Sequence, residues 1–109
     1  LVGSEMCIRD RSMVNVIEGN TGTARRLREK KNYIVAAKTG TAELVSGDNR
    51  EQYSETRLDD SLRDHALIIA FGPMPNPRYA VSVVVENGES GGSVAGPVAI
   101  SVLNSLIQE

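Results

Sequence analysis

The chain has 109 residues and a formal net charge of −2, with 40% hydrophobic, 24% charged and 4% aromatic residues. This length suits one small globular domain, and the charge and the few aromatic side chains argue against a nucleic-acid partner. The single cysteine, Cys7, and the single histidine, His65, exclude an internal disulfide and a cysteine or histidine metal cluster, so we expect neither a metal nor any other cofactor.

Residues 1–12 (LVGSEMCIRDRS) differ in character from the rest of the chain, because isolated apolar residues alternate with charged ones. They are similar to the translated read-through of a sequencing adapter. We therefore expect residues 1–12 to be a non-native tail and residues 13–109 to form the domain. The alternative is an ordinary helix start. Genomic DNA that reads continuously through codons 1–12 into Met13 would contradict the non-native interpretation.

The next segment predicts the end of a helix. Four apolar residues at helical spacing form a short stripe, and Gly19 with Asn20 then supplies a stop and a turn. The stripe consists of Met13, Val14, Val16 and Ile17. The basic residues between positions 25 and 31 are interpreted as a solvated surface turn.

Three strands are predicted at residues 33–43, 65–71 and 79–86, from their apolar character and the turn residues between them. The polar stretch 44–63 is predicted to be a long excursion, either functional or mobile. Prolines make residues 73–77 a turn. We interpret residues 89–92 as a flexible link.

The last predicted element is a helix over residues 94–107, with Pro97 in its first turn, where a missing N–H costs little. One apolar stripe runs along it through Val94, Val98, Val102 and Leu106, with Leu103 and Ile107 beside it. Three consecutive strands joined by short turns predict an antiparallel sheet, with this helix covering one face. The fold class is therefore α+β.

The chemistry of the chain gathers at Lys38, Thr39, Gly40 and Thr41, at the end of the first strand. Side chains alternate along a strand, but twist at a sheet edge can bring all four residues to one cleft. An ammonium and two hydroxyls can bind a carboxylate through charge-assisted hydrogen bonds. Gly40 lets another backbone approach closely, and a free N–H at a sheet edge can pair with an extended peptide or stabilise an oxyanion.

Two other interpretations of this tetrapeptide are a phosphate-binding loop and a polar strand end without a function. A phosphate-binding loop needs glycine directly before the lysine and again five residues earlier, where this chain has Ala37 and Asn32, so it is excluded. A polar strand end without a function stays open on the four residues alone.

The order and spacing of several segments resemble the C-terminal end of the transpeptidase domain of class B penicillin-binding proteins, and the elongation-specific group is the most similar. The matching segments are residues 16–17, 22–24, 34–43, 63–67, 70–71 and 85–88. The resemblance covers residues 13–109 and implies part of a β-lactamase/transpeptidase-like fold: a three-stranded antiparallel sheet with a C-terminal helix.

The resemblance also implies a role for each residue of the motif. Lys38 places positive charge in the cleft and supports proton transfer. Thr39 and Thr41 hold the terminal carboxylate of a D-alanyl-D-alanine stem peptide or of a β-lactam. The N–H of Thr41 forms half of the oxyanion hole, and Gly40 lets the substrate lie close. Lys38 and Thr41 are thus the expected catalytic residues, and Thr39, Gly40 and Thr41 the expected substrate-binding residues.

Two of the three motifs of that family do not occur in this chain, namely Ser-x-x-Lys, which carries the nucleophile, and Ser-x-Asn. We therefore expect a truncated gene product: part of a serine-type peptidoglycan D,D-transpeptidase that is inactive alone. The parent is expected to work with other cell-elongation proteins. It is also expected to be anchored in the bacterial cytoplasmic membrane, with this domain outside it.

Alternatives remain from the same fold and from another class. A serine β-lactamase or a D,D-carboxypeptidase carries the same strand motif, and a non-catalytic binding or sensor domain can share the fold. The upstream sequence discriminates among them. His65, at the start of a strand, is interpreted as a structural hydrogen-bonding residue and not as a catalyst.

Overall fold

The computed structural model describes residues 2–43 and 63–107, with side chains from residue 8 onward. The predicted excursion 44–63 therefore falls, apart from Arg63, outside the described residues. The elements in chain order are α1 (Val2–Glu18), the 3-10 helix η1 (Arg25–Lys30), β1 (Ala36–Ala42), β2 (His65–Gly72), β3 (Tyr79–Val85), the π-helical turn η4 (Gly91–Ala95) and α3 (Gly96–Ile107).

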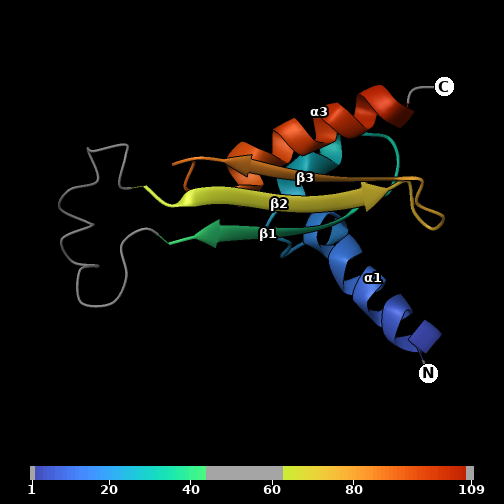
Figure 1. Ribbon diagram of the computed structural model, residues 1–109. Helices are drawn as coiled ribbons and strands as arrows, with labels where there is room; N and C mark the ends of the chain where they lie inside the picture. The colour runs from blue at the N-terminus through green and yellow to red at the C-terminus, as the bar shows by residue number, and fades with distance from the viewer. Residues whose placement is uncertain (1, 44–62, 108–109) are drawn as a thin grey trace.

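The three strands form one antiparallel sheet in the order β1-β2-β3, which confirms the predicted α+β fold (Figure 1). The first strand begins at Ala36 and not at residue 33. Before it, the carbonyl of Ile34 accepts a hydrogen bond from the backbone N–H of Met74 at 2.8 Å. Ile34 therefore pairs with the turn after β2 instead of extending the strand ladder.

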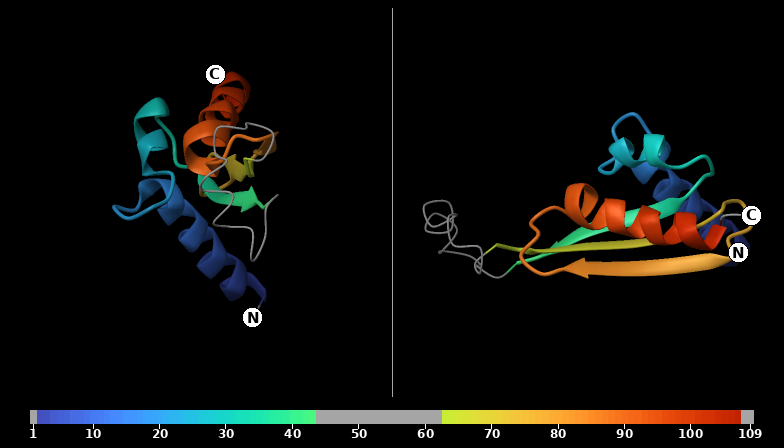
Figure 2. Two further views of the ribbon diagram at one scale, coloured as in Figure 1. Left: turned by 90° about the vertical axis from the view of Figure 1, so that its left-hand side faces the viewer. Right: turned by 90° about the horizontal axis from the view of Figure 1, so that it is seen from above.

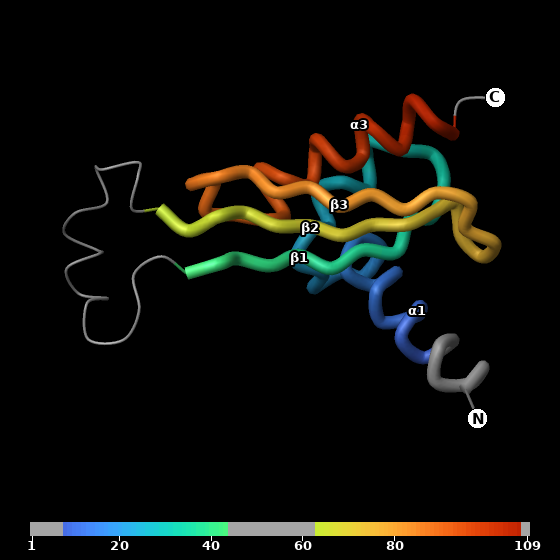
Figure 3. Tube along the Cα trace, in the orientation of Figure 1, coloured from blue at the N-terminus to red at the C-terminus, as the bar shows by residue number. Residues whose placement is uncertain are grey.

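The proline-rich segment between β2 and β3 is a turn, as predicted. Its Gly72–Pro73 and Met74–Pro75 peptide bonds are cis, and the N–H of Arg78 donates to the carbonyl of Gly72 at 3.0 Å. This turn lies at one end of the sheet, and the turn after β3 lies at the other (Figure 3).

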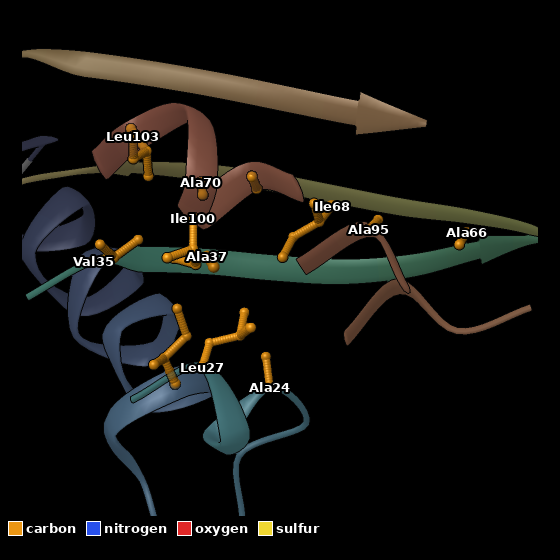
Figure 4. Close-up of a cluster of buried hydrophobic side chains, with 12 residues drawn as sticks. Ala24, Leu27, Val35, Ala37, Ala66, Ile68, Ala70, Ala95, Ile100 and Leu103 are labelled. Atoms are coloured by element: carbon orange, nitrogen blue, oxygen red, sulfur yellow. The ribbon is translucent and has the colours of Figure 1, made fainter. Parts of the chain in front are cut away.

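The core lies on one face of the sheet, where α3, η4 and the C-terminal end of α1 contact the strands and η1 packs against α1 and α3 (Figure 2). Along β2 the side chains alternate, so that Ala66, Ile68 and Ala70 are buried and Ile69 is exposed. They pack against Ile100 and Leu103 of α3 (Figure 4). Each large aliphatic side chain buried here contributes about 1.5–3 kcal/mol of transfer free energy.

Helix α3 covers the sheet as predicted, but not through the predicted stripe. The four residues of that stripe, Val94, Val98, Val102 and Leu106, are 38%, 46%, 39% and 43% exposed. The packing face of α3 instead carries Ala99, Ile100 and Leu103, each at most 1% exposed, and Ala95 at the end of η4 is buried beside it. Small alanines allow the helix axis to approach the sheet closely, which the bulkier valines would prevent.

The predicted flexible link at residues 89–92 is wrong in its second half. Gly91 is buried and begins η4, whose N-terminus is capped by Ser90: the Ser90 hydroxyl accepts from the N–H of Ser93 at 3.2 Å. A Cβ atom on Gly91 would lie 2.3 Å from the carbonyl oxygen of Leu67 and 2.9 Å from that of Gly40. The segment is therefore packed directly against the backbones of β1 and β2.

Helix α1 ends at Glu18, as the apolar stripe predicted, and extends away from the sheet toward its N-terminus (Figure 1). Residues 2–12 are part of this helix, and their non-native origin stays a prediction. Of the basic residues that follow, Arg25, Arg26, Arg28 and Lys30 are exposed, as expected. Lys31 is the exception, because its side chain is only 2% exposed and is paired with Glu18.

Candidate active-site strand

The motif Lys38–Thr41 lies on β1, an edge strand of the sheet. Its register with β2 pairs Thr39 with Ile68, so Thr39 and Thr41 share the helix-covered face. Lys38 and Gly40 belong to the opposite face. Lys38 and Thr41 are exposed, while Thr39 and Gly40 are half-buried. Two of the four motif residues therefore lie on each face of this edge strand.

The Lys38 side chain folds back along its own strand. Its Nζ donates a hydrogen bond to the carbonyl oxygen of Thr39 at 2.7 Å. This bond keeps the ammonium beside the Thr39 backbone while the side chain stays exposed. The cation therefore lies beside the Thr39 backbone and is accessible to an anion from solvent.

The Thr39 hydroxyl has a partner that the sequence did not indicate. Its Oγ1 lies 3.1 Å from the Oγ1 of Thr23, and either hydroxyl can be the donor. Thr23 precedes η1, sixteen residues before Thr39 in the chain. The Gly22–Ala24 segment entered the sequence interpretation only through its resemblance to a family. Its position after a helix end was the one signal that could have drawn attention to it.

Gly40 is not required by the packing of this fold. A Cβ atom at this position would meet the Cβ of Leu67 at 3.8 Å, which is an ordinary van der Waals distance. On the other side of the strand, the backbone of Gly91 approaches Gly40 closely. The close approach that constrains the fold therefore depends on Gly91, and the glycine at position 40 leaves its own face of the strand open.

His65, the first residue of β2, makes a structural hydrogen bond to the turn after β3, in agreement with its interpretation as a structural residue. Its Nδ1 accepts a hydrogen bond from the backbone N–H of Asn87 at 2.9 Å. Asn87, which has a φ of 58°, also donates from Nδ2 to the carbonyl of Arg63 at 2.8 Å. These bonds fix the start of β2 against the turn after β3.

Two concavities in the described part of the chain are lined by residues outside the Lys38–Thr41 motif. One of about 720 Å³ is lined by Lys31, Tyr33 and Asn104 among others. Burial raises the pKa of the Tyr33 hydroxyl, which is hydrogen-bonded to Oδ1 of Asn104. A second, of about 400 Å³, is lined in part by Thr23 and Gly92. Its wall therefore includes the residue that contacts Thr39.

The donors gathered at this edge are an ammonium and hydroxyls, which suit the binding of an anion such as a carboxylate. Among the described residues there is no group of three or more histidine, cysteine, aspartate or glutamate side chains that could hold a metal ion. No described helix is both long enough and apolar enough to cross a membrane.

Residues 7–104 match the penicillin-binding protein transpeptidase domain family, and the chain belongs to that family. The match begins within residues 1–12. This confirms the expected relationship to penicillin-binding transpeptidases.

Two curated relatives are named peptidoglycan D,D-transpeptidase MrdA. The protein from Haemophilus influenzae is 37% identical over 99 residues, which is 91% of this chain and 15% of the relative. The protein from Escherichia coli K12 is 38% identical over 95 residues, which is 87% of this chain and 15% of the relative. The chain therefore spans about one-seventh of the length of these relatives.

Solved structures of penicillin-binding protein 2 share the fold. The Pseudomonas aeruginosa protein in complex with WCK 5153 superposes with a TM-score of 0.74 and is 38% identical; the match covers 92% of this chain and 19% of that one. The Helicobacter pylori protein in complex with MreC gives a TM-score of 0.66 at 29% identity, covering 88% and 16%. The predicted transpeptidase-like fold is thus confirmed.

Proposed function

We propose that this chain is the C-terminal part of a peptidoglycan D,D-transpeptidase and forms the wall of the active site that binds the carboxylate of the substrate. The observation that carries this proposal is the edge strand β1. It carries Lys38, Thr39 and Thr41 in a chain that belongs to the penicillin-binding transpeptidase family, and this supports the proposal.

In the complete enzyme a serine from outside this chain attacks the carbonyl carbon between the two D-alanines. The peptide C–N bond breaks, and the terminal D-alanine leaves with its amine protonated. The resulting acyl-enzyme is then attacked by an amine of a neighbouring stem peptide, which forms the cross-link and frees the serine. A β-lactam acylates the same serine when its ring amide opens.

The residues of β1 have distinct roles in this reaction. Thr39 and Thr41 donate hydrogen bonds to the terminal carboxylate, and the Lys38 ammonium supplies the opposite charge. The N–H of Thr41 serves as one oxyanion donor, and a donor of this kind is worth about 2.7–4 kcal/mol in the transition state. Gly40 leaves room for the substrate strand, and this role is supported by the space beside it, since packing against Leu67 would admit a Cβ atom.

The wider setting of the parent is part of the same proposal. A relative, penicillin-binding protein 2 of H. pylori, has been seen in complex with MreC. We infer that the complete protein also works with a cell-elongation partner. We further propose that the parent is anchored in the cytoplasmic membrane with this domain outside it.

Labelling with a fluorescent penicillin tests the proposal. The 109-residue chain alone is expected to give no covalent adduct, because its sequence holds no Ser-x-x-Lys. Stable stoichiometric labelling of the chain alone would contradict the assignment of the nucleophile to another segment.

The positive arm uses a chimera in which residues 13–109 replace the matching segment of E. coli MrdA. This chimera is expected to form a stable adduct, and Lys38→Ala is expected to slow acylation about 10- to 100-fold through loss of a charged donor. Full-rate acylation of the Lys38→Ala chimera would contradict the role of the motif. Rapid release of the adduct would instead favour the β-lactamase alternative.

A further inference from the structure

We propose that Thr23 is a positioning residue for carboxylate binding: its hydroxyl donates to Thr39 and thereby directs the Thr39 proton toward the substrate. This inference rests on the proposed function of β1. The observation behind it is the contact of 3.1 Å between the two hydroxyl oxygens.

The direction of this hydrogen bond follows from proton accounting. A threonine hydroxyl donates one hydrogen and accepts through its lone pairs, while an ionised carboxylate only accepts. When Thr39 donates to a bound carboxylate, its single proton is used, so the bond between the threonines requires Thr23 as the donor. Thr23 then polarises the Thr39 hydroxyl, because hydrogen bonds in a chain strengthen one another.

The fold holds Thr23 in place from the side of α1. The N–H of Ala24 donates to the carbonyl of Val16 at 3.0 Å, and Ala24 itself is buried in the core. A Cβ atom on Gly22 would lie only 2.2 Å from that same carbonyl oxygen. The backbone on both sides of Thr23 is therefore packed tightly against the end of α1.

A second contact holds the same residue from the side of η4. A Cβ atom on Gly92 would lie 2.7 Å from the carbonyl oxygen of Thr23. Two glycines, Gly22 and Gly92, thus permit the approach that brings Thr23 to Thr39. Thr23 is nevertheless exposed and Thr39 only half-buried, so a ligand can reach the pair from solvent.

The test uses the MrdA chimera and compares benzylpenicillin with its methyl ester, which lacks the carboxylate charge. Thr23→Val removes the hydroxyl and keeps the side-chain shape. It is expected to lower the second-order acylation rate by benzylpenicillin about three- to tenfold, the effect of one hydrogen bond, and to leave acylation by the ester unchanged. Thr23→Ser keeps the hydroxyl and is expected to acylate at nearly the unmodified rate with both compounds.

If Thr23 has a purely structural role, Thr23→Val will slow acylation by both compounds equally. If Thr23 has no role, the substitution will slow acylation by neither. Each result overturns the inference. Thr23→Ala provides a second hydroxyl deletion if the valine variant does not fold. Thr39→Val in the same chimera separates the two proposals. If Thr39→Val slows acylation by benzylpenicillin but not by its methyl ester, and Thr23→Val shows no such difference, only the inference about Thr23 fails. If Thr39→Val shows no selectivity either, the carboxylate-binding function of β1 fails.

Discussion

At the scale of single residues, Lys31 shows how one buried charge connects α1 to the segment that leads into β1. Its Nζ is paired with the carboxylate of Glu18 and donates to the carbonyl of Tyr33 at 2.7 Å. The Lys31 side chain is 2% exposed and that of Glu18 29%. Glu18 can therefore still reach water, whereas the ammonium of Lys31 depends on its protein partners.

This difference predicts unequal effects of removing either partner. Glu18→Ala leaves a buried ammonium without its counter-charge and is expected to cost about 3 kcal/mol of unfolding free energy. Lys31→Met fills the same space with an apolar side chain and is expected to cost about 1 kcal/mol. Urea unfolding followed by circular dichroism measures both. Equal losses of unfolding free energy for the two variants would contradict this prediction.

Tyr33, in the segment before β1, is linked to α3 through its hydrogen bond to Asn104, whose Nδ2 also donates to the carbonyl of Lys30 at 3.0 Å. Burial raises the pKa of Tyr33 above its ordinary value of 10.0. The folded chain therefore holds this proton more tightly than the unfolded chain does.

The sign of the pH dependence follows from linkage. The contribution of Tyr33 to stability is fully present below the unfolded pKa of about 10 and is lost as the pH rises through the higher folded value. We expect the unfolding free energy of the native chain to fall more steeply above pH 10 than that of Tyr33→Phe. Parallel curves for the two proteins in alkaline urea titrations would contradict this.

At the scale of elements, the packing of η4 against β1 determines at which position a residue larger than glycine does not fit. Gly91 lies against the backbone of Gly40 and the carbonyl of Leu67, while the Gly40 side of β1 has room for a Cβ atom. The sequence drew attention to Gly40 alone, because Gly91 looked like part of a flexible link. The structural constraint therefore lies in the segment that was predicted to be a flexible link.

Paired alanine substitutions test this assignment. Gly91→Ala places a Cβ atom against backbone oxygens and is expected to cost about 1–3 kcal/mol or more. Gly40→Ala is expected to leave stability unchanged or to raise it by up to about 1 kcal/mol, since glycine disfavours strands. The same Gly40→Ala change should slow acylation of the MrdA chimera. Comparable destabilisation by both substitutions, measured by urea unfolding, would contradict the assignment.

Helix α3 illustrates where a sequence pattern was insufficient. Its described residues are mostly apolar or small on all sides, so periodicity predicted a helix but could not identify the face that packs. The face was decided by close packing: Gly96 fits against Leu27, where a Cβ atom would lie 2.7 Å from a Leu27 methyl carbon. The valine and leucine stripe consequently remained at the surface.

At the scale of the whole molecule, the described part is a sheet covered by helices on one face. With the strand order β1-β2-β3, both β1 and β3 are edges of the described sheet. Ile69 and Val84 are 50% and 61% exposed on its other face. An accessible valine-rich edge strand is a template for pairing between chains.

We therefore expect the isolated chain to self-associate as its concentration rises, through β3. Val84→Lys places a charge on this edge strand and should shift the equilibrium toward monomers. Asn20→Lys makes the same charge change at an exposed position away from the sheet and is the matched control. Sedimentation velocity distinguishes the outcomes, and equal effects of the two lysines would indicate a general charge effect instead of edge pairing.

The sequence by itself determined the strands, the terminal helix, the α+β class and the Lys38–Thr41 motif, because these depend on local periodicity, on turn residues and on contiguous side chains. It also indicated the family, which was confirmed. Only the tertiary structure decided which face of α3 is buried, which glycine the packing requires, and that Thr23 meets Thr39. Each of these depends on contacts between segments far apart in the chain, where the distance between two backbones, and not the type of either residue, sets what can fit.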